Sequence, residues 1–202
     1  MAPLIIVYKY GVGNVYSVKA SLERAGARVR IVESLSEAGK ADAVVFPGVG
    51  SMPAAMRKLE REKDIVYRLV EKSKPLLGIC LGMQLLYEAG TEHGYTRGLG
   101  LLRGIVERLR VKPLPHMGWS VVERVRGSAL LEGLPERFYA YYAHSYAPKN
   151  TEAPHVRALT REGFEEFVAV VEKGSVYGTQ FHPEKSGRLG QAIISNFVAL
   201  SR

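Results

Sequence analysis

One short segment, in which Cys80 separates two apolar runs, most constrains how this chain can fold. Residues 76–79 form an apolar run that predicts a buried strand, and residues 83–87 form a second run that predicts an apolar helix. A strand that changes into a helix within one residue needs close backbone approach on both sides of the joint. Gly78 and Gly82 allow that approach because they carry no side chain.

This Gly-x-Cys-x-Gly pattern is typical of a nucleophile elbow, in which a reactive side chain sits where a strand meets a helix. A side chain at a helix start lies near unpaired N–H groups and the positive end of the helix dipole, which favour thiolate over thiol. The alternative is that Cys80 is a small buried hydrophobe, as most free cysteines are. The flanking glycines and the strand-to-helix change favour a reactive Cys80.

Strand-like and helix-like segments alternate through the first half of the chain. The predicted strands are 4–8, 28–32, 43–46 and 76–79, and the predicted helices are 15–25, 52–59 and 63–72. This order predicts an α/β fold with a mostly parallel, doubly wound sheet flanked by helices. Functional groups in such a fold gather at the carboxyl ends of the strands, where Cys80 and the loops 11–14 and 47–50 all fall.

Several short segments with polar and apolar alternation follow in the second half, which predicts additional antiparallel strands. These segments are 104–109, 120–125, 137–143, 155–159 and 167–171. A further strand at 176–181 ends at His182, and an amphipathic helix at 189–200 covers the sheet. Because no linker, repeat or low-complexity segment interrupts the chain, we predict a single domain over residues 1–202.

Composition excludes several functional classes. The formal net charge is +8, but Lys and Arg are scattered and mostly interleaved with Glu, so we expect no nucleic-acid partner. A solvated surface, or one that docks an acidic partner, accounts better for this charge. No apolar run approaches the roughly 20 residues of a membrane span, so we expect no membrane association. The single cysteine leaves no internal disulfide and favours a cytoplasmic location.

A thiolate nucleophile needs a base, and the base needs an orienting group. Among the five histidines, His182 with Glu184 is the best candidate pair, because both follow a strand end. Their spacing in extended backbone places both side chains on one face, and Pro183 between them favours that backbone. The carboxylate would set the tautomer of His182 and stabilise its cation. A lone His-x-Glu is more often a surface pair, but the Cys80 elbow at the same sheet edge favours catalysis.

Acyl transfer also creates an oxyanion, which needs two hydrogen-bond donors. We predict that the backbone N–H of Leu81 is one of them, because it follows the nucleophile at the helix start. The loop 47–50 follows a neighbouring strand, and its glycines would let it present the second donor at Val49 or Gly50. The alternative is an ordinary strand-to-helix turn.

These motifs together resemble those of the class I, triad-type glutamine amidotransferases. The motifs are Pro-Gly-Val-Gly at 47–50, Gly-Ile-Cys-Leu-Gly-Met-Gln at 78–84 and His-Pro-Glu-Lys at 182–185. Within this family, further pieces resemble the glutaminase subunits of imidazole glycerol phosphate synthases: Tyr-Gly-Val-Gly-Asn at 10–14, the Val-Gly form of the loop at 49–50, Pro-His-Met-Gly-Trp at 115–119 and Ala-His-Ser-Tyr at 143–146. Lys9 and Ser120 depart from the subfamily, where an acidic residue and Asn are common.

The resemblance implies a reaction and a set of substrate contacts. Cys80 would attack the side-chain amide of L-glutamine, release ammonia and leave a γ-glutamyl thioester, which water activated by His182 would hydrolyse to glutamate. The positions that match glutamine-binding residues of the family are Gly50, Gln84 and the backbone of Ser145 and Tyr146. His144 could be a substrate contact or a packed loop residue, and both interpretations stay open.

The resemblance also implies a partner. The ammonia would pass to a cyclase subunit, which is a (β/α)8 barrel that forms a heterodimer with this chain and makes imidazole glycerol phosphate and an aminoimidazole carboxamide ribotide in histidine biosynthesis. No metal or organic cofactor is implied. Met117, Trp119, Tyr141 and Lys185 would face the cyclase, with Trp119, the only tryptophan, on a predicted loop. The alternative is that Trp119 caps the core and Lys185 is solvated.

Two other functions remain open at this point. The chain could be the glutaminase component of another synthase, such as one that makes anthranilate, GMP or pyridoxal phosphate. The Met-Gly-Trp segment at 117–119 argues against that. It could instead be a catalytically silent regulatory protein on the same fold, which an intact set of Cys80, His182 and Glu184 disfavours.

Overall fold

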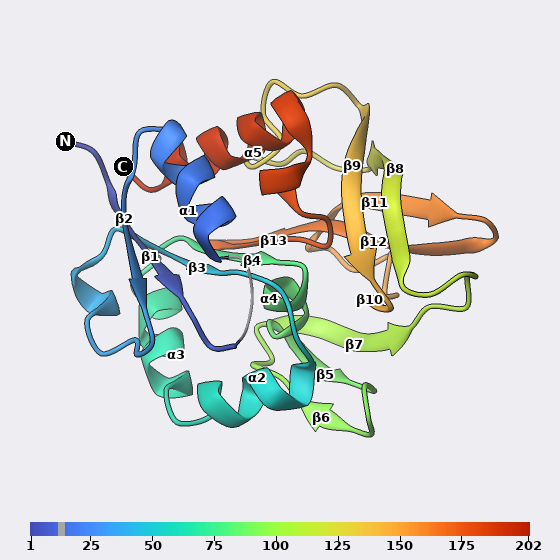
Figure 1. Cartoon of the computed structure of the whole chain (residues 1–202), viewed down its shortest axis with the longest axis horizontal. Coiled ribbons are helices and arrows are strands. Elements are labelled where there is room, and N and C mark those ends of the chain that lie inside the picture. The colour runs from blue at the N-terminus through green and yellow to red at the C-terminus, as the bar shows by residue number, and fades with distance from the viewer. Residues whose placement is uncertain (12–14) are drawn as a thin grey trace.

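A nine-stranded mixed sheet forms the centre of the molecule (Figure 1). The computed structural model describes residues 1–11 and 15–202, so most of the turn predicted at 11–14 lies outside the described residues. Five neighbouring strands pair in parallel in the order β2-β1-β3-β4-β13. They are β1 (Leu4–Tyr8), β2 (Arg28–Val32), β3 (Ala43–Phe46), β4 (Leu76–Ile79) and β13 (Val176–Thr179). The parallel half of the fold is therefore as predicted.

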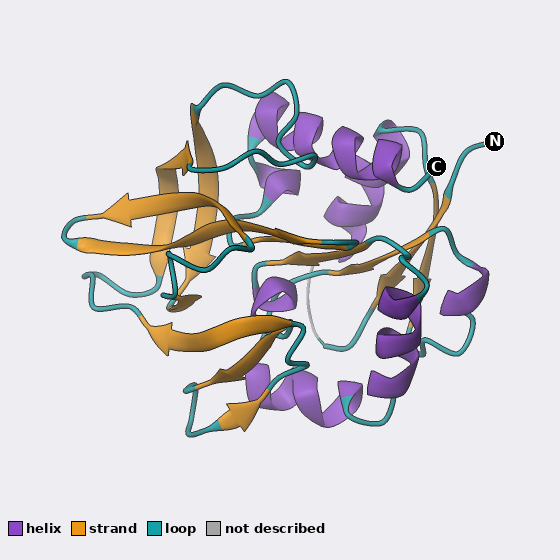
Figure 2. Ribbon diagram, turned by 180° about the vertical axis from the view of Figure 1, so that it is seen from behind, coloured by secondary structure: helices purple, strands orange, loops and turns teal. Residues whose placement is uncertain are grey.

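Helices cover both faces of this parallel half (Figure 2). On one face, α1 (Val15–Arg24) and α5 (Gly187–Leu200) form a core with alternate residues of β1, namely Ile5 and Val7. On the other face, α2 (Met52–Leu59) and α3 (Lys63–Glu71) pack on the intervening residues Ile6 and Tyr8. Burial of both faces explains why these strands are almost wholly apolar.

The sheet continues beyond β13 as antiparallel strands in the order β12-β11-β8-β9, which confirms the predicted antiparallel additions. They are β12 (Glu165–Lys173), β11 (Val156–Glu162), β8 (His116–Arg124) and β9 (Arg137–His144). The predicted loop at 117–119 is wrong, because β8 already begins at His116. Its inward-facing residues His116 and Ser120 are polar, while Met117 and Trp119 point outward, which is the reverse of the usual alternation.

A second sheet of four strands, in the order β10-β7-β5-β6, was not predicted. Its strands are β10 (Tyr146–Pro148), β7 (Leu102–Arg108), β5 (Tyr87–Gly90) and β6 (Thr96–Arg97). The predicted helix at 83–87 is wrong, because α4 (Leu81–Gln84) ends after one turn and the chain enters β5. There the carbonyl groups of Leu85 and Leu86 accept backbone hydrogen bonds from Leu99 and Leu102. Periodicity cannot separate a helix from a strand in so short an apolar run.

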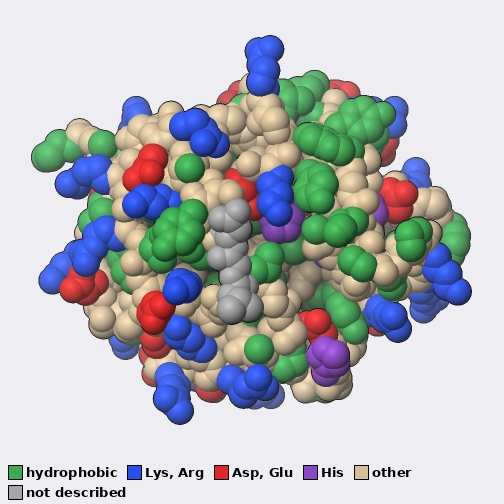
Figure 3. Space-filling model, in the orientation of Figure 1, with side chains coloured by type: hydrophobic (Ala, Val, Ile, Leu, Met, Phe, Trp, Pro, Cys, Tyr) green, Lys and Arg blue, Asp and Glu red, His purple; other side chains and the backbone are tan. Residues whose placement is uncertain are grey.

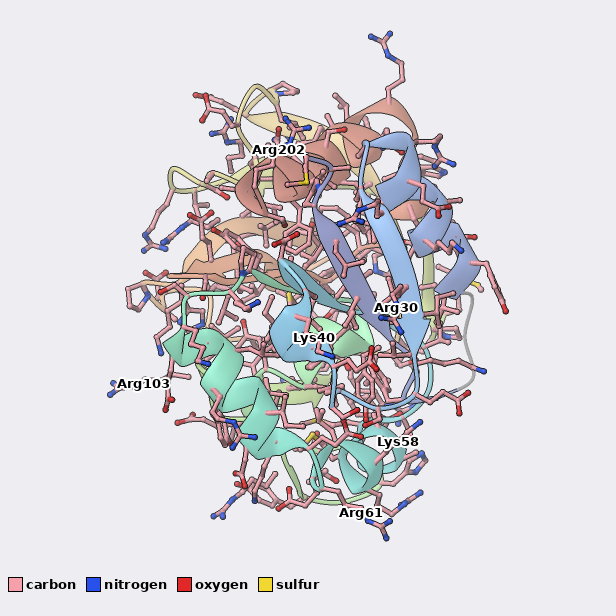
Figure 4. All side chains as sticks on the ribbon, turned by 90° about the vertical axis from the view of Figure 1, so that its left-hand side faces the viewer. Arg30, Lys40, Lys58, Arg61, Arg103 and Arg202 are labelled. Atoms are coloured by element: carbon pink, nitrogen blue, oxygen red, sulfur yellow. The ribbon has the colours of Figure 1, made fainter. Side chains whose placement is uncertain are left out.

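The surface charge is dispersed. Figure 4 labels six cationic side chains, from β2, the 3-10 helix η1 (Ala38–Lys40), α2, β7 and two further positions, and they lie apart from one another. In the described part of the chain, no helix is both long enough and apolar enough to cross a bilayer.

Candidate active site

The joint between β4 and α4 places Cys80 at the carboxyl edge of the parallel strands. Cys80 has φ 51° and ψ −107°, a conformation that is rare and costly for a side chain with a Cβ atom. A Cβ atom on Gly78 would lie 2.6 Å from Met83 N, and one on Gly82 would overlap the carbonyl group of Phe46. Both glycines therefore allow the close backbone approach that the sequence pattern predicted.

Cys80, His182 and Glu184 meet at this edge. His182 Nδ1 lies 2.9 Å from Glu184 Oε1, and both side chains are buried. Burial alone would lower the pKa of His182, but the charge of Cys80 and its hydrogen bond, followed by Glu184, raise that pKa to about 10. His182 is thus protonated near neutral pH and able to give a proton to a departing amine.

The backbone that brings His182 and Glu184 together differs from the predicted one. The sequence pattern predicted an extended segment, but the chain turns after His182 into the 3-10 helix η2 (Pro183–Lys185). The Ser186 hydroxyl donates to the His182 carbonyl at 2.7 Å and closes this turn. The turn, not a strand face, directs both side chains to the same side.

The loop 47–50 packs directly on the nucleophile. A Cβ atom on Gly48 would overlap the Ile79 carbonyl oxygen and would lie 2.6 Å from Leu81 N. Val49 and Gly50 are exposed, and Gly50 has φ 117°, a value that L side chains rarely adopt. The loop therefore lies against the backbone of residues 79–81, and no side chain other than hydrogen fits at Gly48.

Tyr10 supports this loop and was missed by sequence analysis as a site residue. Its buried hydroxyl donates a hydrogen bond to the Pro47 carbonyl. Burial, and then the charge of Cys80, hold the pKa of Tyr10 well above its usual value, so the hydroxyl keeps its proton.

We expect Gly48→Ala to reduce the glutamine hydrolysis that the resemblance implies by roughly a hundredfold or more, because the added methyl group would displace the predicted second oxyanion donor. The measurement is the rate of glutamate release, with the melting temperature determined in parallel. Gly39→Ala is the matched control, because nothing lies within 4 Å of a Cβ atom there. Equal rates for the two variants would contradict this placement of the loop.

An open cavity of about 380 Å³ lies in front of Cys80. Every residue predicted to bind glutamine or to form the oxyanion hole lines it: Val49, Gly50, Leu81, Gln84, His144, Ser145 and Tyr146. Two charged residues missed by sequence analysis, Glu92 and Arg108, line it as well. Glu92 Oε2 also accepts the backbone N–H of Met52 at 2.7 Å, at the start of α2. These charges come from the second sheet and its loops, which the sequence pattern did not reveal.

His144 proves to be both packed and part of the cavity wall. Its Nδ1 lies 2.9 Å from the Tyr146 carbonyl oxygen, to which Gln84 Nε2 also donates at 2.7 Å. Burial lowers the pKa of His144 to about 3, so the ring is neutral and Nδ1–H is the donor. The ring therefore holds the Tyr146 carbonyl in the wall of the cavity.

A buried polar network, which the sequence pattern did not predict, lies behind His144. His116 Nδ1 lies 3.4 Å from His144 Nε2, and His116 Nε2 lies 3.0 Å from Ser120 Oγ. The Ser120 hydroxyl in turn donates to Glu162 Oε2 at 2.8 Å. Ser120, one of the two departures from the subfamily pattern, is thus the link between His116 and a carboxylate.

The four residues predicted to face a partner lie together on one surface. Trp119 and Tyr141 are opposite each other on β8 and β9, with ring centroids 6.1 Å apart. Lys185 Nζ lies 5.8 Å from the centre of the Tyr141 ring, and Met117 is two residues from Trp119 on the same strand face. Hydrophobic side chains gather over β8 and β9 in Figure 3, and exposed Tyr139 extends this surface.

Residues 6–200 match the family described as glutamine amidotransferase class-I, and the chain belongs to this family. The solved structure of a putative GMP synthase component from Thermoplasma acidophilum shares the fold, with a TM-score of 0.77 and 21% identity over 100% of this chain and 94% of the other. The sequence-based family prediction and the predicted fold class are therefore confirmed.

Among individual relatives, the chain is similar to proteins named imidazole glycerol phosphate synthase subunit HisH. It is 43% identical to the one from Mycobacterium bovis, over 98% of each chain. It is 40% identical to the one from Listeria innocua, over 96% of this chain and 94% of the relative.

Proposed function

We propose that this chain is the glutaminase subunit of an imidazole glycerol phosphate synthase and supplies ammonia to a cyclase subunit for histidine biosynthesis. The observation that carries the proposal is the meeting of His182 and Glu184 with Cys80, which itself lines the cavity. Full-length similarity to HisH subunits supports this synthase over those that make anthranilate, GMP or pyridoxal phosphate. The intact triad argues against a silent regulatory protein.

The geometry supports a two-step reaction. In the first step, Cys80 Sγ bonds to the amide carbon of glutamine, the carbon–nitrogen bond breaks, and His182 gives its proton to the departing ammonia. In the second step, water attacks the thioester carbon and gives a proton to His182, and the carbon–sulfur bond breaks to release glutamate. The N–H groups of Leu81 and of Val49 or Gly50 would stabilise the oxyanion in both steps.

The charged lining of the cavity suits an amino acid. Glu92 would bind the α-ammonium group of glutamine, and Arg108 would bind its α-carboxylate, since a carboxylate and a guanidinium match those charges. Gln84 gives its side-chain N–H groups to Tyr146 and Gln180, so its carbonyl oxygen is left to accept a hydrogen from the substrate amide. We propose Gly50, Ser145 and Tyr146 as backbone contacts.

Dependence on a partner follows from the product. Ammonia released at Cys80 escapes to solvent unless the site opens into a second active site. The Cys80 site therefore has to close against solvent when the cyclase docks. The proposed docking surface, formed by Met117, Trp119, Tyr141 and Lys185, is joined to the triad through the backbone. The carbonyl group of Tyr141 accepts the N–H of His182 at 2.9 Å. Contact with a (β/α)8 barrel cyclase at this surface would therefore act on the position of His182.

We expect the isolated chain to hydrolyse glutamine slowly, and the cyclase loaded with its substrate or an analogue to raise the rate by at least roughly tenfold. The experiment compares glutamate release by the chain alone, by the complex, and by the loaded complex. Glutamine-dependent formation of imidazole glycerol phosphate by the complex tests the proposed function itself. Full activity in the chain alone, without a response to the cyclase, would contradict the proposed coupling.

Trp119→Ala is expected to weaken the complex by about 2 kcal/mol or more, because exposed tryptophans dominate many interfaces. Lys185→Ala is expected to change activation while leaving the dissociation constant nearly the same, since Lys185 directly follows the triad carboxylate. Titration calorimetry measures the first effect and glutamate release the second. Phe164→Ala, at an exposed position outside the proposed surface, is the control.

A further inference from the structure

Gln180 reaches the nucleophile from the same segment that carries His182. β13 ends at Thr179, and the next residue is fully buried, with its backbone N–H bonded to the Ala169 carbonyl at 2.9 Å. Its side-chain Nε2 lies 3.6 Å from Cys80 Sγ. The His182 side chain also hydrogen-bonds to Cys80, so Gln180 and His182 both contact the sulfur although the backbone bends between them.

The orientation of the Gln180 amide follows from its neighbours. The Tyr146 carbonyl can only accept, so the Gln84 atom that lies 2.7 Å from it must be the amide nitrogen. That nitrogen also lies 3.1 Å from an atom of the Gln180 amide, which must therefore be the oxygen. The remaining Gln180 atom, which points at Cys80, is then the nitrogen. If the Gln180 amide were flipped, its nitrogen would face the Gln84 nitrogen, and two hydrogen-bond donors would oppose each other in a buried site.

We propose that Gln180 is a further catalytic residue of this site, whose side-chain N–H donates to Cys80 Sγ and favours the thiolate. A hydrogen bond to the charged form of a group stabilises that form, and the effect is strong where water is excluded. The same donor stabilises the thiolate again when it leaves the thioester in the second step. This role in turnover rests on the proposed glutaminase function, whereas the contact itself does not.

Several other groups act on the Cys80 sulfur. The carbonyl group of Ala143, on β9, lies 4.0 Å away and can only accept, so it favours the thiol. The titratable groups nearest the sulfur are His182, with Glu184 behind it, and Tyr10 from the segment after β1. Glu92 and Arg108 line the cavity in front. Gln180 adds an uncharged donor to this set, so its removal changes no formal charge.

The test measures the rate of Cys80 alkylation by iodoacetamide as a function of pH in the full chain. Because Cys80 is the only cysteine, the modification reports this sulfur alone. In Gln180→Met, which keeps the length of the side chain but removes the donor, we expect the pH midpoint of alkylation to rise by about one unit. Gln191→Met, on α5, is the matched control and should keep the wild-type profile.

Gln180→Leu provides the second variant, in case Gln180→Met does not fold. It also removes the donor without adding a charge, so the midpoint should again rise by about one unit. Melting temperatures identify which variants are folded. A lower melting temperature with a midpoint within about 0.2 units of wild type in the folded variants would mean that Gln180 only packs, and would overturn the proposal.

Turnover in the complex separates this proposal from the proposed function. With the cyclase bound, we expect kcat for glutamine to fall by roughly tenfold or more in Gln180→Met, while the ammonium-dependent cyclase reaction is unchanged. Absence of glutamine-dependent turnover in the wild-type complex would refute the proposed function, and the alkylation profile would still decide the Gln180 contact. A shifted alkylation profile with unchanged kcat would overturn the catalytic role.

Discussion

Cys80→Ala is expected to abolish glutamine hydrolysis while leaving the fold and the binding of the cyclase intact. The side chain lost is the only thiol in the chain, so no other cysteine can form the thioester. Alanine and cysteine have a similar energetic cost at φ 51°, so the substitution adds no backbone strain at the elbow. The measurement is glutamate release by the complex, together with circular dichroism and a binding titration.

Free ammonium supplies the internal control for this variant. With ammonium salts in place of glutamine, the cyclase bound to Cys80→Ala should turn over at the wild-type rate. Glutamine-dependent turnover within about tenfold of wild type would exclude Cys80 as the nucleophile, because loss of a nucleophile costs several orders of magnitude.

His182→Asn is expected to reduce glutamine hydrolysis by about two to four orders of magnitude, because a general base and acid is lost. Glu184→Gln should cost less, since Glu184 does not exchange protons with the substrate but orients His182 through a 2.9 Å contact. Steady-state kinetics of both variants in the complex give the comparison. A larger loss for Glu184→Gln would reverse the two roles.

The pH profile provides a second measure of the same pair. The raised pKa of His182, about 10, means that its protonated form predominates below that pH and is lost above it. Proton donation to ammonia should therefore persist into alkaline solution and decline as the pH rises through the pKa of His182. Because Glu184 contributes to that raised pKa, Glu184→Gln should move the alkaline limit to lower pH. An alkaline limit that is identical in the two proteins would contradict this contribution.

Local pattern was sufficient to predict the parallel half of the fold and the candidate triad. Strands that are apolar along their whole length require cover on both faces, and Gly78 and Gly82 have room for nothing but hydrogen. His182 and Glu184 are neighbours in the chain, so their meeting depends on a few local torsion angles. The predicted backbone was wrong, yet the pair still forms, because a turn and an extended segment both allow contact at this spacing.

The second sheet and the polar wall of the cavity depend on hydrogen bonds between segments that lie far apart in the sequence. Residues 85–90 leave the helical path because their carbonyl groups bond to the chain around residues 99–102, and this places Glu92 in the cavity. His116 and Ser120 are polar residues on the inner face of β8. Their burial is possible only because His144 and Glu162 arrive from β9 and β11 to bond them.

Short segments of the chain were enough to indicate the family, the nucleophile elbow and the residues of the candidate triad, because the chemistry of each segment is local. Only the assembled fold places the Gln180 side chain beside Cys80 and the Tyr10 hydroxyl beside Pro47. The Gln180 amide is oriented by a chain of donors and acceptors that begins at the Tyr146 carbonyl, and the Tyr10 hydroxyl bonds to Pro47. Hydrogen bonds between distant segments form only when the whole sheet is in place, so local pattern carries no signal for them.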